Sequence, residues 1–166
     1  MLAIARVDGW SIVVVAALSA LWSLGTAAWV ETEVSVFVLF AGATELTGRR
    51  LLVRGHARGL SSLIGAQLYL LAVIWTYAGW RWYGFEPQTF WEALPSLAQV
   101  EIDRQLAAAG LDPEANRPLF LEVMNATTCF LVAGITLFYQ GGLAVYYSRQ
   151  RERVRQALLA SPPVVS

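Results

Sequence analysis

The stretch that decides the fold is Gly9–Val30, GWSIVVVAALSALWSLGTAAWV, which contains no charged residue. Two later stretches, Gly59–Trp80 and Val123–Ser148, are equally free of charge. A helix needs about 20 apolar residues to cross the roughly 30 Å hydrocarbon core of a bilayer. Each of these three stretches is long enough to do so. The sequence therefore predicts an all-α integral membrane protein.

A fourth, weaker apolar stretch runs from Val34 to Val53 and is interrupted by Glu45, Arg49 and Arg50. Its charges lie toward one end, so we predict a fourth transmembrane helix here. A turn at Glu31–Glu33 would join the first two helices as an antiparallel hairpin, and the other two would form a second hairpin. The four predicted helices cover about residues 10–30, 34–53, 60–80 and 118–147.

Composition excludes most soluble and cofactor-dependent classes. The chain has 166 residues and only 14% charged residues, with a mean hydropathy of +0.51, which is too apolar for an ordinary soluble domain. We expect a single domain over residues 1–166. With one cysteine, Cys129, and one histidine, His56, a protomer cannot form an internal disulfide, a bis-histidine haem site or a dithiol relay. We therefore predict no cofactor, no metal site and no catalytic residues, and we favour a non-enzyme.

The arginines indicate the orientation in the membrane. Arg49, Arg50, Arg54 and Arg58 surround the turn between the second and third helices, and four more arginines lie in the tail, residues 148–166. Positive residues mark the cytoplasmic face of a membrane protein. Both termini are therefore predicted to be cytoplasmic, and the membrane is predicted to be a bacterial inner or plasma membrane.

The segment between the third and fourth helices, residues 81–117, is the largest part expected outside the membrane. Apolar residues recur on one face from Trp91 to Ala109, at helical spacing. Pro95 is expected to break this pattern, and Asp112-Pro113-Glu114 has the form of a helix cap and first turn. We predict one or two short amphipathic helices in this extracytoplasmic loop.

Glu45 is the strongest candidate for a functional residue, because an ionisable group at membrane depth is costly and is by default a functional suspect. The competing interpretation is an ion pair with Arg49, which lies four residues later in the favourable acid-before-base order. We favour the ion pair from sequence.

Gln67 and Gln140 lie at a similar depth to Glu45, each about 10 Å from the cytoplasmic end of its predicted helix. The three could form a polar layer that lines a transport pathway. Interhelical hydrogen bonding is the competing and more common explanation of such a layer.

Small residues recur at four-residue spacing in the first helix, at Ser19, Ser23 and Ala27. Such spacing allows two helix backbones to approach closely, so we predict a packing seam, either within the protomer or toward a neighbouring subunit.

Two functions remain open from sequence. The favoured one is a non-catalytic subunit or scaffold of a homo-oligomer or larger membrane complex. The alternative is an oligomeric small-ion channel or transporter that uses Glu45, Gln67 and Gln140. The expected partners are membrane lipids, further copies of the chain or other membrane subunits, and no nucleic acid.

Overall fold

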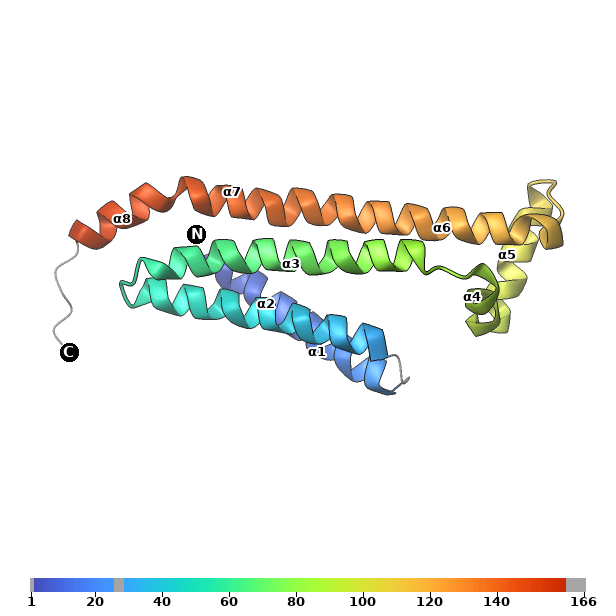
Figure 1. Ribbon diagram of the computed structural model, residues 1–166, viewed down its shortest axis with the longest axis horizontal. Coiled ribbons are helices and arrows are strands. Elements are labelled where there is room, and N and C mark those ends of the chain that lie inside the picture. The colour runs from blue at the N-terminus through green and yellow to red at the C-terminus, as the bar shows by residue number, and fades with distance from the viewer. Residues whose placement is uncertain (1, 26–28, 161–166) are drawn as a thin grey trace. The chain divides into compact units, whose positions relative to one another are not determined.

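The computed structural model describes residues 2–25 and 29–160, with backbone alone for 158–160, and these ranges contain helices and no strand. In chain order the elements are α1 (Leu2–Gly25), α2 (Trp29–Val53), α3 (Arg58–Tyr83), α4 (Pro87–Ala93), α5 (Ser96–Ala108), α6 (Pro113–Thr136), the π-helix η1 (Leu137–Gly141), α7 (Gly142–Arg149) and α8 (Arg151–Ala160) (Figure 1). The prediction of an all-α chain is confirmed.

Three helical segments are long and apolar enough to cross a membrane: Leu2–Gly25, Arg58–Tyr83 and Pro113–Arg149, the last of which comprises α6, η1 and α7. Helix α2 is not among them, because Glu45 and two arginines interrupt its apolar stretch. Composition and length thus support three spans directly.

The chain divides into two compact units. Unit 1 comprises Met1–Trp75 and Ile135–Ser166, and unit 2 comprises Thr76–Gly134. The single domain expected over residues 1–166 stays a prediction.

The break between the first two helices lies earlier than predicted. Helix α1 begins at Leu2 and ends at Gly25, and α2 begins at Trp29. The turn predicted at Glu31–Glu33 is wrong, because these residues are helical. Glu31 lies in the first turn of α2, where the positive end of the helix dipole stabilises an acidic side chain. The acids therefore mark the start of a helix and not a loop.

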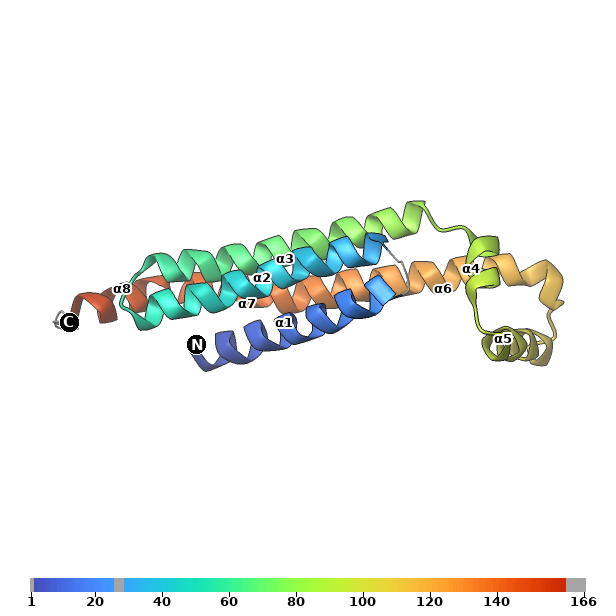
Figure 2. The same cartoon turned by 90° about the horizontal axis from the view of Figure 1, so that it is seen from below.

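Helix α2 runs back alongside α1, as both views show (Figures 1 and 2). Near the end of α2, Arg49 Nε donates a hydrogen bond of 3.3 Å to the carbonyl oxygen of Leu2, at the start of α1. Glycines permit the close approach: a Cβ added at Gly42 would lie 2.8 Å from Cγ2 of Val13 and 3.2 Å from the carbonyl oxygen of Gly9. A larger residue at this crossing would push α1 and α2 apart.

A second glycine crossing joins α2 to the first turns of α3. A Cβ added at Gly48 would lie 2.9 Å from the carbonyl oxygen of Gly59 and 3.1 Å from the backbone nitrogen of Leu63. The turn between the two helices contains Gly55 at a φ of 80°, a conformation that glycine adopts without steric penalty. Close packing was predicted only at serines and alanines of α1, and these glycines of α2 and α3 were missed.

The apolar core of unit 1 lies toward the end that carries the α2–α3 turn. It is formed by Ala5, Leu52, Leu60, Leu63 and Tyr147, with Val154 of α8 packed against it. These residues come from α1, α2, α3 and α7. Four helices and α8 therefore share one buried cluster.

The prediction of short helices in the loop over residues 81–117 is confirmed by α4 and α5. Leu94 and Pro95 separate them, as expected from the proline, and Gly110 follows α5 at a φ of 76°. In unit 2 these helices lie beside the first half of α6.

The last long helix begins sooner than predicted. Helix α6 starts at Pro113, and Pro118, the predicted first residue, lies inside it. The Oδ1 atom of Asp112 accepts a 3.1 Å hydrogen bond from the backbone nitrogen of Glu114. This contact is the cap predicted from the sequence, and it allows helix formation more than one turn before Pro118.

Candidate functional site

Two carboxyl groups are buried between the helices of unit 1. Asp8 on α1 is 5% exposed, and Glu45 on α2 is 0% exposed. They meet where α1 and α2 approach closely, since a Cβ added at Gly9 would lie 3.6 Å from Cβ of Glu45. The side chains of Asp8 and Glu45 lie close enough to interact directly. A pair of acids in the interior of an apolar bundle is unusual, because burying a charge is expensive.

Asp8 receives a hydrogen bond at each carboxylate oxygen. Nε2 of Gln67 on α3 donates to Oδ2 at 3.1 Å. The hydroxyl of Tyr139 on η1 donates to Oδ1 at 3.0 Å. Asp8 therefore links α1 to two other helices, and both of its oxygens are matched by donors.

Glu45 is matched at one oxygen. The hydroxyl of Tyr147 on α7 donates to Oε1 at 3.3 Å, and Tyr147 is itself fully buried. The other oxygen, Oε2, is buried and accepts no hydrogen bond from the residues that the structure describes. Gln67 also lies within interaction distance of Glu45. Both acids thus lie near the amide of Gln67, but Asp8 accepts a hydrogen bond at each oxygen and Glu45 at only one.

Two further buried acceptors lack donors within the described ranges. They are Oε1 of Gln67, which is 1% exposed, and Oε1 of Gln140, which is 6% exposed. A buried acceptor without a donor is destabilising by about 1–3 kcal/mol. All three unmatched atoms in unit 1 are oxygens that can only accept, or can be protonated in the case of Glu45. Among the described residues, the interior of unit 1 therefore has more hydrogen-bond acceptors than donors.

Gln140 and Tyr139 lie on a π-turn of the backbone. The π-helix η1 interrupts the helix formed by α6 and α7 at Leu137–Gly141. Single π-turns inside α-helices are rare, and those that do occur are often found at functional sites. Here the extra residue in the turn presents Tyr139 to Asp8 while Gln140 stays buried.

Arg49 does not neutralise Glu45. Its Nε donates to the carbonyl oxygen of Leu2, and the ion pairs found among the described residues are Arg104–Glu101 and Arg117–Asp103. The predicted pairing of Glu45 with Arg49 is therefore wrong. Glu45 lies on the buried face of α2, whereas Arg49 is partly exposed at the end of the α1–α2 crossing.

The candidates chosen from sequence are all buried in unit 1. Glu45 and Gln67 lie close together, and Gln140 lies on η1 beside Tyr139. The predicted packing seam is less uniform: Ser23 is buried, Ser19 is exposed, and Ala27 lies outside the described residues. The seam stays a prediction.

Asp8, Tyr139 and Tyr147 were missed. Asp8 lies before residue 10, where the first helix was expected to begin, and neither tyrosine was among the predicted site residues. A signal did exist, because Ala5, Asp8 and Gly9 share one helical face of small or polar residues, and all three are buried.

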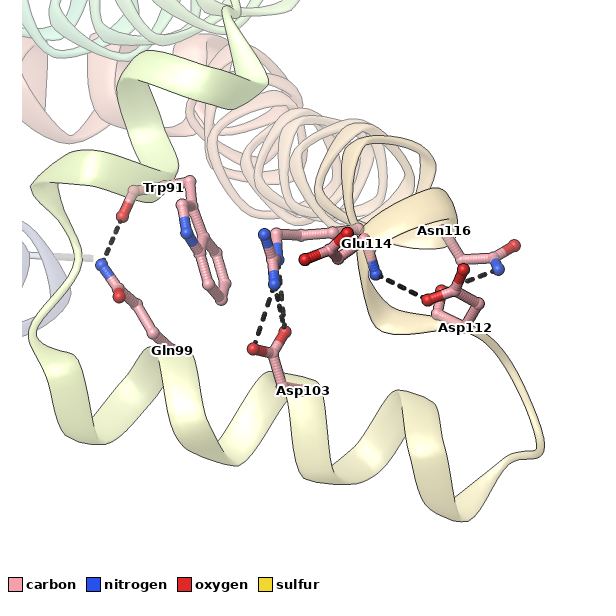
Figure 3. A network of polar contacts seen from close by, with 7 residues as sticks. Trp91, Gln99, Asp103, Asp112, Glu114 and Asn116 are labelled. Atoms are coloured by element: carbon pink, nitrogen blue, oxygen red, sulfur yellow. Dashed lines mark hydrogen bonds and ion pairs between the residues drawn. The ribbon is translucent and has the colours of Figure 1, made fainter.

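Unit 2 has a polar network of a different kind (Figure 3). Nε and Nη2 of Arg117 on α6 donate to the carboxylate of Asp103 on α5 at 3.0–3.2 Å. The same guanidinium lies 4.0 Å from the ring centroid of Trp91 on α4. Nε2 of Gln99 donates to the carbonyl oxygens of Trp91 and Leu94 at 2.9 and 3.1 Å. This network joins α4, α5 and α6, and the charges of Arg117 and Asp103 are paired. We therefore interpret it as a structural clamp, a set of contacts that holds the three helices together.

The chemistry available in unit 1 is that of proton or cation binding. Among the described residues there is no group of three histidine, cysteine or acidic side chains that could hold a metal ion. Comparison with known protein families, curated proteins and solved structures finds no match. The residues that can carry a function are therefore the buried or partly buried polar side chains of unit 1, which we call the polar cluster: Asp8, Glu45, Gln67, Tyr139, Gln140 and Tyr147.

Proposed function

We propose that this chain is an integral membrane protein of ion transport, a subunit of a channel or transporter whose polar cluster binds the ion in transit. The observation that carries this proposal is Glu45: it is fully buried, and its Oε2 atom has no donor among the described residues. Ionisable groups inside transmembrane bundles are rare, and they commonly mark ion paths and proton relays.

We propose that the chain crosses the membrane four times, with α2 as the fourth span. Glycine crossings pack α2 against both α1 and α3, and this packing keeps Glu45 away from lipid. A helix that hides its acid in this way can cross a bilayer although its composition is less apolar than that of its neighbours. The arginines at the α2–α3 turn and in α8 support an orientation with both termini in the cytoplasm.

We further propose that several copies, or additional membrane subunits, complete the pathway. Large apolar side chains such as Leu21, Phe40 and Phe138 are exposed on the helices of unit 1. These surfaces suit contact with lipids or with other transmembrane helices. Four helices offer little room for a pathway within one copy, so an oligomer in a bacterial inner or plasma membrane is the arrangement we favour.

A non-catalytic subunit or scaffold is the second candidate, and a specific observation supports it. The hydrogen bonds of Asp8 and Glu45 connect α1, α2, α3, η1 and α7. Interhelical hydrogen bonds of this kind contribute on average about 0.6 kcal/mol each to a membrane bundle. In this interpretation the polar cluster only holds the helices together, and its unmatched oxygens bind no ion.

Reconstitution separates the two candidates. The purified chain is incorporated in lipid vesicles, and the fluxes of protons, sodium and potassium are each measured under an imposed gradient and compared with protein-free vesicles. The transport proposal predicts a flux of at least one of these ions above the protein-free level. Vesicles that contain correctly folded oligomer and show no flux of any of the three would favour the scaffold.

A further inference from the structure

We propose that the Asp8–Glu45 pair binds a single exchangeable proton, which is held on Oε2 of Glu45 next to an ionised Asp8. This inference rests on the proposed transport function for its biological meaning, and it names the ion as a proton. It follows from the count of hydrogen-bond donors and acceptors around the two carboxyl groups.

Asp8 has the surroundings of a carboxylate. An ionised carboxyl group only accepts hydrogen bonds, and both oxygens of Asp8 accept one, from Gln67 and from Tyr139. A proton on either oxygen of Asp8 would weaken that oxygen as an acceptor for a donor already in place. The negative charge of the pair is therefore best placed on Asp8.

Glu45 has the surroundings of a carboxylic acid. Tyr147 donates to Oε1, while Oε2 is buried without a donor among the described residues. A proton on Oε2 converts this unmatched acceptor into a donor. Its neighbours Asp8 and Gln67 both offer acceptor oxygens, and Oε1 of Gln67 is itself unmatched. One proton thus removes an unmatched acceptor and supplies a donor where donors are scarce.

The other groups that face the pair cannot neutralise a second charge. Among the described residues, the groups that interact with the pair are Gln67 from α3, Tyr139 from η1 and Tyr147 from α7, and all three are uncharged in their ordinary state. Arg49 does not contact the pair, because its Nε donates to the carbonyl oxygen of Leu2 at the edge of the bundle. Two neighbouring carboxylates in an apolar interior repel each other and lack solvation, so one of them takes up a proton.

The same geometry disfavours a metal cation. The hydrogens of Gln67 Nε2 and of the Tyr139 and Tyr147 hydroxyls already point at three of the four carboxyl oxygens. A cation that bound these oxygens would lie close to those hydrogens, whose partial positive charge repels it. A proton on Oε2 leaves all three hydrogen bonds intact.

Infrared spectroscopy of the full chain in lipid nanodiscs tests the inference without any transport assay. The carbonyl band of a protonated carboxyl group is distinct from that of a carboxylate, and it is recorded while pH is varied. We expect one buried protonated carboxyl in the wild type at neutral pH, its loss in Glu45→Gln, and its retention in Glu33→Gln, where the exposed acid of α2 is changed instead. Absence of the band from the wild type, or its survival in Glu45→Gln, would overturn the inference.

A second variant keeps the test decisive if Glu45→Gln fails to fold. Tyr147→Phe removes the donor to Glu45 while the carboxyl group stays, so the band should persist at a shifted frequency. An unshifted band in Tyr147→Phe would contradict the assignment. Disappearance of the band on addition of sodium at constant pH would overturn the proton in favour of a sodium ion. A protonated Glu45 in vesicles that conduct no ion would refute the transport function and leave this inference standing.

Discussion

The α2–α3 crossing offers a quantitative test of how the bundle is packed. In Gly48→Ala the added methyl group would lie 2.9 Å from the carbonyl oxygen of Gly59 and 3.1 Å from the nitrogen of Leu63. Both neighbours are backbone atoms, and ordinary contacts of this kind begin at about 3.4 Å. The helices would therefore have to move apart. Overpacking of this type destabilises a folded protein by about 1–3 kcal/mol.

Gly65→Ala is the matched control. Gly65 lies in the interior of α3, and a Cβ added there meets no atom within 4 Å. Both variants gain the same helix propensity, at most about 1 kcal/mol, so this contribution cancels when they are compared. The free energy of unfolding of Gly48→Ala should fall below that of Gly65→Ala by about 1–3 kcal/mol.

The assay is reversible unfolding in mixed micelles with a rising fraction of SDS, followed by tryptophan fluorescence. Equal free energies of unfolding for the two variants would refute the close approach of α2 and α3. That result would also weaken the argument that α2 is shielded from lipid by its neighbours.

Two other predictions concern unit 2 and the topology. Arg117→Lys keeps the charge but loses the paired hydrogen bonds to Asp103; we expect a loss of about 1 kcal/mol, seen as faster hydrogen exchange in α5, and unchanged exchange would contradict the clamp. Single cysteines at Ser96 and Arg151, in a Cys129→Ser background, should differ in intact cells: an impermeant thiol reagent should label the first and not the second, and the reverse pattern would overturn the orientation.

In unit 2 the sequence was sufficient to predict the short helices and the cap of α6, although the start of α6 was expected at Pro118 and lies at Pro113. Pro95 separates α4 from α5, and Asp112 caps α6 through a contact with a residue two positions away. These signals are local, because the residue that stops or starts a helix is adjacent to the helix. The turn predicted at Glu31–Glu33 was wrong because acidic residues occur both in loops and in the first turns of helices. Their presence alone therefore does not distinguish a loop from a helix start.

The polar cluster was only partly predictable. Apolar stretches identified Glu45 and Gln67 as polar residues inside predicted helices, but not what they contact. Tyr139 and Asp8 are 131 positions apart in the chain, and their contact depends on the rotation of two helices and on the π-turn at Leu137–Gly141. A π-turn shifts the register of every later residue, so a regular helical pattern could not place Tyr139 against α1.

The most direct test of the account compares proton flux through vesicles that contain Glu45→Gln with flux through vesicles that contain Glu33→Gln, at equal protein content and oligomer size. Both variants replace one acid of α2 by its amide, but Glu45 is buried in the polar cluster and Glu33 is exposed. If Glu45 carries the proton, Glu33→Gln conducts protons like the wild type, while Glu45→Gln falls to the level of protein-free vesicles. Equal flux through the two variants would contradict it.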